Sequence, residues 1–272
     1  MGSVDNFPAH FGLKLTKTFH TKAEGPTLPE NNRVKSPFVV LVTGAGKGLG
    51  FHISLAYARA GASGIIIASR TKADLAELSD QLRAVNPHID ILARTCDTTK
   101  DADVKQLAAE TKSHFGRLDV AVANAGVISK YKYDGDGQIG RLPLGIVEDD
   151  DFERVIDINF LGSYRVAKHF VPLLIETRDG PQAYIVITSL ACHIQDSTFT
   201  PVAYNVSKIA VDRMAEHIHN DHYEKDGVVA FAVHPGAVVT PQTEQHNKTN
   251  NSSAWDDCEF DIWFPPPPAS HR

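Results

Sequence analysis

The feature that most constrains this chain is a short apolar run followed by a cluster of glycines, between Pro37 and Gly50. Residues 38–42 are apolar and rich in β-branched side chains, which is typical of a strand buried on both faces of a parallel sheet. Residues 51–60 contain neither glycine nor proline and indicate a helix. A strand, a glycine turn and a helix N-terminus can cradle a pyrophosphate, because backbone N–H groups and the helix dipole point at the anion. The stretch therefore predicts a dinucleotide site, although one glycine turn alone also fits an ordinary tight turn.

The spacing of the glycines narrows the kind of site. The familiar pattern G-x-G-x-x-G fails, because starting it at Gly44 places Leu49 where the third glycine belongs. The pattern T-G-x-x-x-G-x-G fits instead, with Thr43, Gly44, Gly48 and Gly50.

Apolar runs and helical segments alternate along the rest of the chain. Strands are predicted at residues 64–68, 89–93, 118–123, 184–188 and 228–233, and helices at 72–84, 101–115, 152–175 and 201–223. This alternation predicts an α/β fold: a single doubly wound parallel (Rossmann) sheet with helices on both faces. Residues 129–151 have no periodicity and are predicted to form a surface loop.

The two ends of the chain differ from this middle part. Residues 1–36 are polar and interrupted by prolines, and are predicted to be a loosely ordered extension. Residues 37–240 form the predicted catalytic domain. Residues 241–272 are an atypical polar tail that closes on four successive prolines, and they contain no recognisable last strand. We therefore expect the sheet to lack an edge strand after residue 233.

Charge and cysteine content exclude several classes of protein. The formal net charge is -6 without a basic block, so binding of nucleic acid is not expected. No apolar segment is long enough to span a membrane. The three cysteines fit no disulfide framework and no C-x-x-C site, which favours a reducing compartment and a cytoplasmic location.

Two basic residues near the predicted dinucleotide site bear on the choice of cofactor. An acidic residue about 20 positions after the glycine turn usually binds the ribose 2′-hydroxyl. Counting from Gly50, this position is Arg70, since 70 minus 50 is 20, and Lys47 adds a second cation inside the turn. Both favour a 2′-phosphate, and hence NADP(H) over NAD(H). The alternative is that both are solvated surface charges.

Tyr204 and Lys208 are four positions apart on one predicted helix, so their side chains share a face. A nearby ammonium and a cationic nicotinamide would favour the phenolate, and lowering a tyrosine pKa from about 10 to about 7 takes roughly 4 kcal/mol. Ser189 follows a strand at the sheet edge where ligands bind, and it could donate to a developing alkoxide. Taken singly, a Tyr-x-x-x-Lys pair is equally compatible with an ordinary amphipathic helix.

Other polar residues have a structural and a functional interpretation. Asn159 lies against the apolar stripe of its predicted helix, where a buried amide needs hydrogen-bond partners whatever its role. His217, His219 and His222 cluster on one helix, but no acidic or thiol ligand completes a set, so no metal site is predicted.

Taken in their order along the chain, the motifs over residues 37–240 resemble those of the short-chain dehydrogenase/reductase family. The matching residues are Thr43 to Gly50, Asp97, Asn124-Ala125-Gly126, Asn159, Ser189, Tyr204 to Lys208, and Pro235-Gly236 with Val238 and Thr240. The resemblance implies hydride transfer between a nicotinamide cofactor and a small ketone or secondary alcohol. It also implies pairing into a homodimer or homotetramer through the helices that contain Phe152 and Tyr204.

The resemblance assigns a role to each matching residue. Tyr204 would be the general acid and base, Lys208 would lower its pKa and hold the nicotinamide ribose, Ser189 would orient the substrate oxygen, and Asn159 would place a water. The expected cofactor contacts are Gly44, Leu49 and Gly50 at the pyrophosphate, Asp97 at the adenine, Asn124 on the adenosine side, and Val238 and Thr240 at the carboxamide.

The chain departs from the family pattern in three places. Ala123 replaces the first Asn of N-N-A-G, and the interval from Ser189 to Tyr204 is longer than usual. The third departure is the tail after Thr240, which contains no final strand. It leaves open a second reading, a catalytically impaired or truncated nucleotide-binding protein, and a third, a poorly folding fragment without a role.

Overall fold

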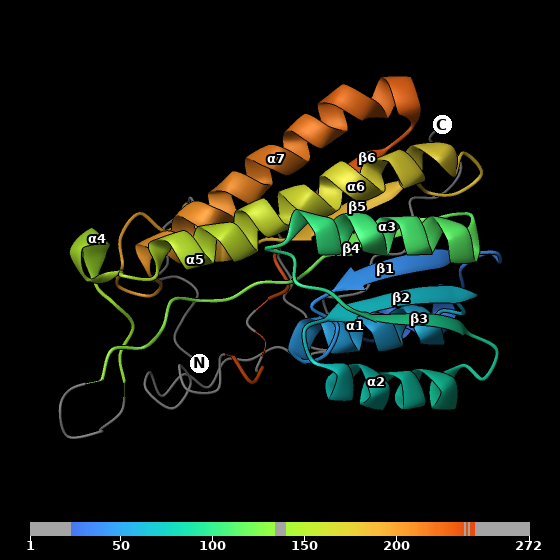
Figure 1. Ribbon diagram of the computed structural model, residues 1–272, viewed down its shortest axis with the longest axis horizontal. Coiled ribbons are helices and arrows are strands. Elements are labelled where there is room, and N and C mark those ends of the chain that lie inside the picture. The colour runs from blue at the N-terminus through green and yellow to red at the C-terminus, as the bar shows by residue number, and fades with distance from the viewer. Residues whose placement is uncertain (1–22, 134–139, 237, 239, 243–272) are drawn as a thin grey trace.

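The computed structural model describes residues 23–133, 140–236, 238 and 240–242, and its centre is a six-stranded parallel sheet (Figure 1). The strands are β1 (Val39–Thr43), β2 (Gly64–Ser69), β3 (Asp90–Thr95), β4 (Val120–Ala123), β5 (Ala183–Ile187) and β6 (Val229–Val233). Their order in the sheet is β3-β2-β1-β4-β5-β6. From β1 the strands follow one another towards one edge of the sheet, and from β4 towards the other edge. Such sheets bind ligands at the point between β1 and β4 where this order reverses. The predicted doubly wound Rossmann sheet is confirmed.

Helices cover both faces of this sheet. On one face lie α1 (Gly48–Arg59) and α2 (Lys72–Val85), and on the other lie α3 (Asp101–Phe115), α6 (Gly162–Glu176) and α7 (Val202–Asp226) (Figure 1). Successive side chains of a strand point to opposite faces. Accordingly Val40 and Val42 pack with α1, whereas Val39 and Leu41 pack on the side of α6. This two-sided burial explains why the strands are continuous apolar runs.

The predicted long helix over 152–175 is interrupted in the structure. It consists of α5 (Phe152–Ile156), a π-helical turn (Asp157–Leu161) and α6. The sequence pattern did not reveal the turn, because one extra residue per turn shifts the apolar stripe only slightly. Such turns frequently occur at functional sites, and this one contains Asn159.

The predicted loop over 129–151 contains more structure than expected in its described part. A short helix, α4, spans Gly145–Glu148. Lys132 and Arg141 form an antiparallel bridge, and the Arg141 guanidinium pairs with Glu148 at 2.6 Å. The absence of periodicity concealed these contacts, because they depend on single charged pairs.

A buried ion pair fixes β1 against β4 at the end of the sheet opposite the glycine turn. The Asp119 side chain is only 1% exposed. Its carboxylate accepts hydrogen bonds from the Val39 backbone N–H at 2.8 Å and from the Arg117 guanidinium at 2.7 and 2.9 Å. Arg117 also reaches the exposed Asp179 at 3.1 Å.

Within the described residues β6 is an edge strand, as the sequence predicted. Of the predicted N-terminal extension, residues 1–22 lie outside the described part. The remainder forms two 3-10 turns, Gly25–Thr27 and Pro29–Asn31, and the Arg33 guanidinium donates to the Arg59 carbonyl at 2.9 Å. The tail beyond residue 242 also lies outside it. No helix in the described ranges is long and apolar enough to cross a bilayer.

Candidate active site

The glycine turn joins β1 to α1 at the carboxyl edge of the sheet. Gly44 has φ +65, and a Cβ there would lie 2.8 Å from the Ala125 Cα. A Cβ on Gly50 would lie 2.4 Å from the Gly44 carbonyl oxygen. Both positions therefore require glycine. Leu49 lies in the first turn of α1 and packs on the core, so the exposed side of that turn is backbone. This geometry fits an anion cradle at the start of a helix.

Asn124 holds this turn in place. Its side-chain amide donates to the carbonyls of Thr43 at 2.9 Å and Gly44 at 3.3 Å. The Thr43 hydroxyl in turn accepts from the Asn124 backbone N–H at 3.1 Å. The sequence placed Asn124 on the adenosine side of the cofactor. In the structure its side chain connects β4 to the glycine turn, so it shapes the site through the backbone.

Ser189, Tyr204 and Lys208 come together at the end of β5. Ser189 begins a 3-10 turn (Leu190–His193), and its hydroxyl accepts from the Ala191 N–H at 3.2 Å. The hydroxyls of Ser189 and Tyr204 share a hydrogen bond. The Lys208 ammonium lies 5.3 Å from the centre of the Tyr204 ring and donates to the Ile187 carbonyl at 2.7 Å. A hydroxyl donor, a titratable phenol and a cation thus meet at one point, as the sequence predicted.

Burial controls the protonation of this group. The Lys208 side chain is buried, which lowers its pKa to about 8, against the opposing effect of the Asp212 charge. Burial also raises the pKa of Tyr204, and the hydrogen bond with Ser189 partly lowers it again. The sequence analysis expected a lowered pKa for Tyr204. The direction differs because that lowering needs two cations, and the protein alone supplies only Lys208, which is itself partly discharged by burial.

Asn159 lies beside Lys208 with all its side-chain groups in use. Its amide donates at 2.9 Å to both the Val127 carbonyl and the Ser207 hydroxyl, and its oxygen accepts from the Val127 N–H at 2.8 Å. A Cβ on Gly126 would lie 3.4 Å from the Asn159 oxygen and 3.8 Å from the Lys208 ammonium. The amide is therefore satisfied in the core and also borders the ammonium, and its expected role in placing a water stays a prediction.

Lys47 and Arg70 flank the glycine turn from different elements. Lys47 directly precedes α1, and its ammonium lies 3.4 Å from the Asp74 carboxylate on α2. Arg70 follows β2 and is exposed. The sequence did not foresee Asp74. Lys47 is therefore a paired surface charge, and Arg70 remains open to solvent at the entrance to the turn.

Asp97 follows β3 and is partly buried, which by itself favours the neutral acid. Hydrogen bonds from the Thr99 hydroxyl at 2.8 Å and the Thr99 N–H at 3.0 Å, with the charge of Arg70 nearby, lower the pKa of Asp97 below its ordinary value. The carboxylate is thus ionised and bound to its own turn. It remains a candidate for contact with the adenine.

The two residues expected at the carboxamide follow β6. Val238 is buried, and Thr240 lies close to the glycine turn, because a Cβ on Gly48 would be 3.3 Å from the Thr240 Cβ. The segment after β6 therefore returns to the start of α1. This contact closes one side of the site.

Comparison with known proteins agrees with this geometry. The sequence profile of the short chain dehydrogenases matches residues 38–251. The chain belongs to the short-chain dehydrogenase/reductase family. This is a family of oxidoreductases that bind a nicotinamide cofactor. The resemblance drawn from the sequence motifs is confirmed.

Curated members of the family include fungal proteins similar to this chain. Short chain dehydrogenase pgmD of Aspergillus terreus is 34% identical over 242 residues, which cover 86% of this chain and 74% of that protein. Short chain dehydrogenase pigC of Monascus ruber is 33% identical over 236 residues, covering 83% of this chain and 70% of the other.

Solved structures of family members show the same fold. A short-chain type dehydrogenase/reductase from Mycobacterium marinum aligns with a TM-score of 0.67 at 24% identity, covering 80% of each chain. An alcohol dehydrogenase from Thermococcus sibiricus, complexed with 5-hydroxy-NADP, aligns with a TM-score of 0.59 at 25% identity, covering 75% of this chain and 77% of that one.

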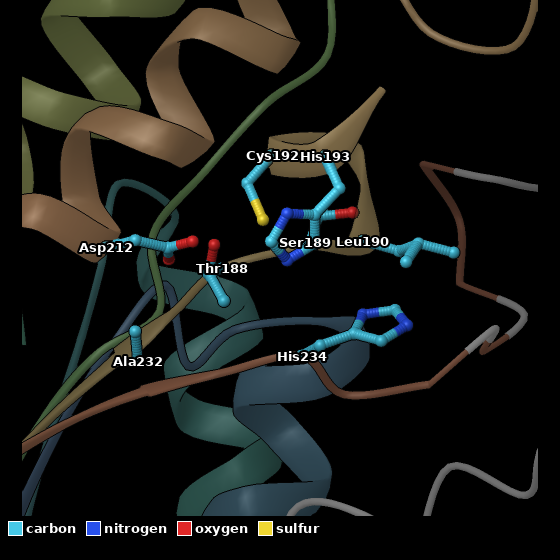
Figure 2. A pocket seen from close by; sticks show the side chains of 8 residues that line it. All are labelled: Thr188, Ser189, Leu190, Cys192, His193, Asp212, Ala232 and His234. Carbon is cyan, nitrogen blue, oxygen red and sulfur yellow. The ribbon is translucent and has the colours of Figure 1, made fainter. Parts of the chain in front are cut away.

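A cavity of about 230 Å³ lies beside the Ser189 hydroxyl of this short-chain dehydrogenase (Figure 2). It is lined by Thr188, Ser189, Leu190, Cys192, His193, Asp212, Ala232 and His234. Sequence reasoning singled out only Ser189 among these. Asp212 could have been found, since it lies four positions after Lys208 on the same helix. Cys192 could not, because its place depends on the 3-10 turn. Among the described residues no group of three His, Cys, Asp or Glu side chains is placed to hold a metal ion.

Proposed function

We propose that this protein is an NADP(H)-dependent oxidoreductase that interconverts a ketone and a secondary alcohol of a small organic substrate. The observation that carries the proposal is the convergence of Tyr204, Ser189 and Lys208 at the sheet edge beside the glycine turn. The proposal is supported by the family and by the alcohol dehydrogenase activity named for the Thermococcus sibiricus relative.

Each residue of the site has its own role in the proposed hydride transfer. A bound nicotinamide would supply or accept the hydride. In reduction Tyr204 donates its phenolic proton to the carbonyl oxygen, and in oxidation the phenolate takes the proton of the alcohol. Ser189 donates a hydrogen bond to the same oxygen as negative charge develops there. Lys208 stabilises the phenolate and would hold the ribose of a bound nicotinamide cofactor, and Asn159 fixes the backbone of Val127 beside Lys208.

We propose NADP(H) over NAD(H) because the position after β2 holds a cation. Arg70 is exposed and has no carboxylate within ion-pair distance among the described residues, so its guanidinium can bind a 2′-phosphate bidentately. Lys47 can add a second contact if it exchanges Asp74 for the phosphate. The 5-hydroxy-NADP bound by the Thermococcus sibiricus relative is in line with this preference.

Titration of the protein with NADPH and NADH tests the cofactor directly. We expect Arg70→Ala to weaken NADPH binding about 10- to 100-fold, the worth of a hydrogen bond to a charged group, and to change NADH binding less than twofold. Nicotinamide fluorescence and the rise in melting temperature report the two affinities. Arg83→Ala, an exposed arginine at the other end of α2, is the matched control. Equal losses for both cofactors would contradict the assignment of Arg70 to the 2′-phosphate.

Apolar side chains on two packed helices support pairing of two copies. Leu161 and Tyr164 are exposed on the π turn and α6, and Val206 and Ile209 are exposed on α7. Exposed apolar groups on one surface favour burial in an interface. We therefore propose a homodimer formed through these helices, with a homotetramer as the larger form.

Light scattering after size-exclusion chromatography tests the dimer. Ile209 is 48% exposed, and we expect Ile209→Glu to convert the protein to monomers, because a carboxylate would be desolvated in the interface. Val85→Glu on α2 introduces the same charge at a side chain that is 40% exposed, and it should leave the dimer intact. A wild-type protein that is monomeric at all concentrations would overturn the proposal.

A second candidate, a nucleotide-binding protein without catalysis, rests on the edge position of β6 and the family's longer sheet. It predicts cofactor binding without turnover of any ketone or secondary alcohol. A screen of small ketones with NADPH, run on protein that binds the cofactor, separates the two functions.

Cys96 and Cys192 are free thiols, which supports the proposed reducing, cytoplasmic compartment.

A further inference from the structure

The helix α7 places a charged side chain, Asp212, in line with the two catalytic ones. Tyr204, Lys208 and Asp212 follow one another at intervals of four residues, so all three share one face of the helix. Asp212 reaches into the cavity beside Ser189, where Figure 2 shows its carboxylate directed towards Thr188 and Cys192. The family motif ends at Lys208 and assigns nothing to this position.

Within the described part of the chain, the Asp212 carboxylate has an incomplete set of hydrogen-bond donors around it. One carboxylate oxygen, Oδ1, is buried and has no hydrogen-bond partner among the described residues. The Cys192 thiol bonds with the Asp212 carboxylate, and burial together with this negative charge raises the pKa of Cys192 to about 12. Cys192 therefore stays a neutral thiol that donates its proton. A partly buried carboxylate without a full set of donors is costly unless a cation lies near it.

Lys208, one turn earlier on α7, is a cation on which the charge of Asp212 acts. Its ammonium is buried and donates a hydrogen bond to the neutral Ile187 carbonyl. The titratable groups that face it are Tyr204 and Asp212 on α7 and Cys192 on the 3-10 turn, while His193 and His234 lie across the cavity. Among these, Asp212 alone is a carboxylate. Burial alone would discharge Lys208, and the charge of Asp212 opposes that loss.

We propose that Asp212 is a positioning residue that keeps Lys208 protonated across the neutral pH range, and through Lys208 favours the reactive phenolate of Tyr204. The part that concerns Tyr204 rests on the proposed oxidoreductase function. The part that concerns Lys208 does not, because Asp212 follows Lys208 by one turn of α7 in the folded protein without substrate.

A double-mutant cycle on stability tests the pairing without any substrate. The free energy of unfolding is measured by urea denaturation for wild type, Lys208→Met, Asp212→Asn and the double variant, at pH 6 and pH 9.5. With a pKa of about 8, Lys208 is charged at the lower pH and neutral at the higher. We expect a favourable coupling of about one pKa unit, tenfold or about 1.4 kcal/mol, at pH 6, which disappears at pH 9.5. A coupling that is absent, or equal at both pH values, would overturn the proposal.

The pH dependence of turnover tests the consequence for Tyr204. With NADP⁺ and cyclohexanol as the probe, we expect Asp212→Asn to move the acid limb of the pH–rate profile up by about one unit, a tenfold loss at pH 7. Asp212→Glu should restore the profile, and Asp221→Asn, an exposed acid on the same helix, should leave it unchanged. Superimposed profiles for wild type and Asp212→Asn would overturn this role. Coupling in the cycle without turnover of any alcohol would instead reject the proposed function and leave the Lys208–Asp212 pairing standing.

Discussion

Replacing Tyr204 with Phe is expected to lower turnover about 10³-fold, because a positioned acid or base contributes about 10² to 10⁴ to the rate. The ring remains in place and so does its contact with the Lys208 ammonium, at 5.3 Å from the ring centre. Only the proton carrier is removed. Binding of NADPH should therefore change less than threefold. Steady-state rates of ketone reduction and fluorescence titration of the cofactor measure the two quantities.

The matched control for this variant lies on the same helix. Tyr223 is exposed near the end of α7, where its ring stacks on His219. Tyr223→Phe should leave turnover and cofactor binding unchanged. If Tyr204→Phe kept turnover within tenfold of wild type, the assignment of Tyr204 as the acid and base would be wrong, whatever the effect on binding.

The second large effect is expected at Asp119, far from the chemistry. Asp119→Ala should lower the free energy of unfolding by about 3–5 kcal/mol, because it removes the buried partner of the half-buried Arg117 guanidinium and leaves it, among the described residues, only the exposed Asp179. It also removes the acceptor of the Val39 N–H at the start of β1. Arginine stays protonated in proteins, so Arg117 cannot avoid this cost by losing its proton. Thermal unfolding should begin about 10 °C lower.

Two comparisons separate the buried pair from the exposed one. Asp179 contacts the same arginine at 3.1 Å but is exposed, so Asp179→Ala should cost less than about 1 kcal/mol. The double variant Arg117→Met with Asp119→Leu should regain part of the stability lost in Asp119→Ala, because no unpaired charge remains. Urea unfolding at neutral pH measures all three. A loss below about 1 kcal/mol for Asp119→Ala would contradict the importance of this pair.

Most of the fold could be predicted from the sequence because its signals are local. The strand β1 was predicted at residues 38–42 and spans Val39–Thr43, and α3 was predicted at the residues it occupies. Buried parallel strands are continuous apolar runs, which the sequence shows directly. The glycines of the turn, where a Cβ would clash, are recognised by their spacing alone. The same locality placed Ser189 after β5 and the Tyr204–Lys208 pair on α7, and it indicated the edge position of β6.

Features that depend on packing between distant segments were not visible. The π turn at Asn159 leaves the apolar periodicity almost intact, so one long helix was predicted. The helix α4, the backbone bridge between Lys132 and Arg141, and the ion pair of Arg141 with Glu148 lie within a segment that has no periodicity. The amide of Asn124 holds the glycine turn, a contact between residues 80 positions apart that the sequence did not reveal.

The sequence by itself determined the order of strands and helices, the glycine turn and the identity of the groups that carry the chemistry. Only the tertiary structure decided their protonation. Lys208 loses proton affinity because β5, the 3-10 turn and α7 exclude water from its ammonium together, and Asp212 opposes that loss from one turn away. Desolvation depends on every atom packed around a group, whichever part of the chain supplies it. The spacing of residues along the sequence therefore does not predict the protonation of Lys208.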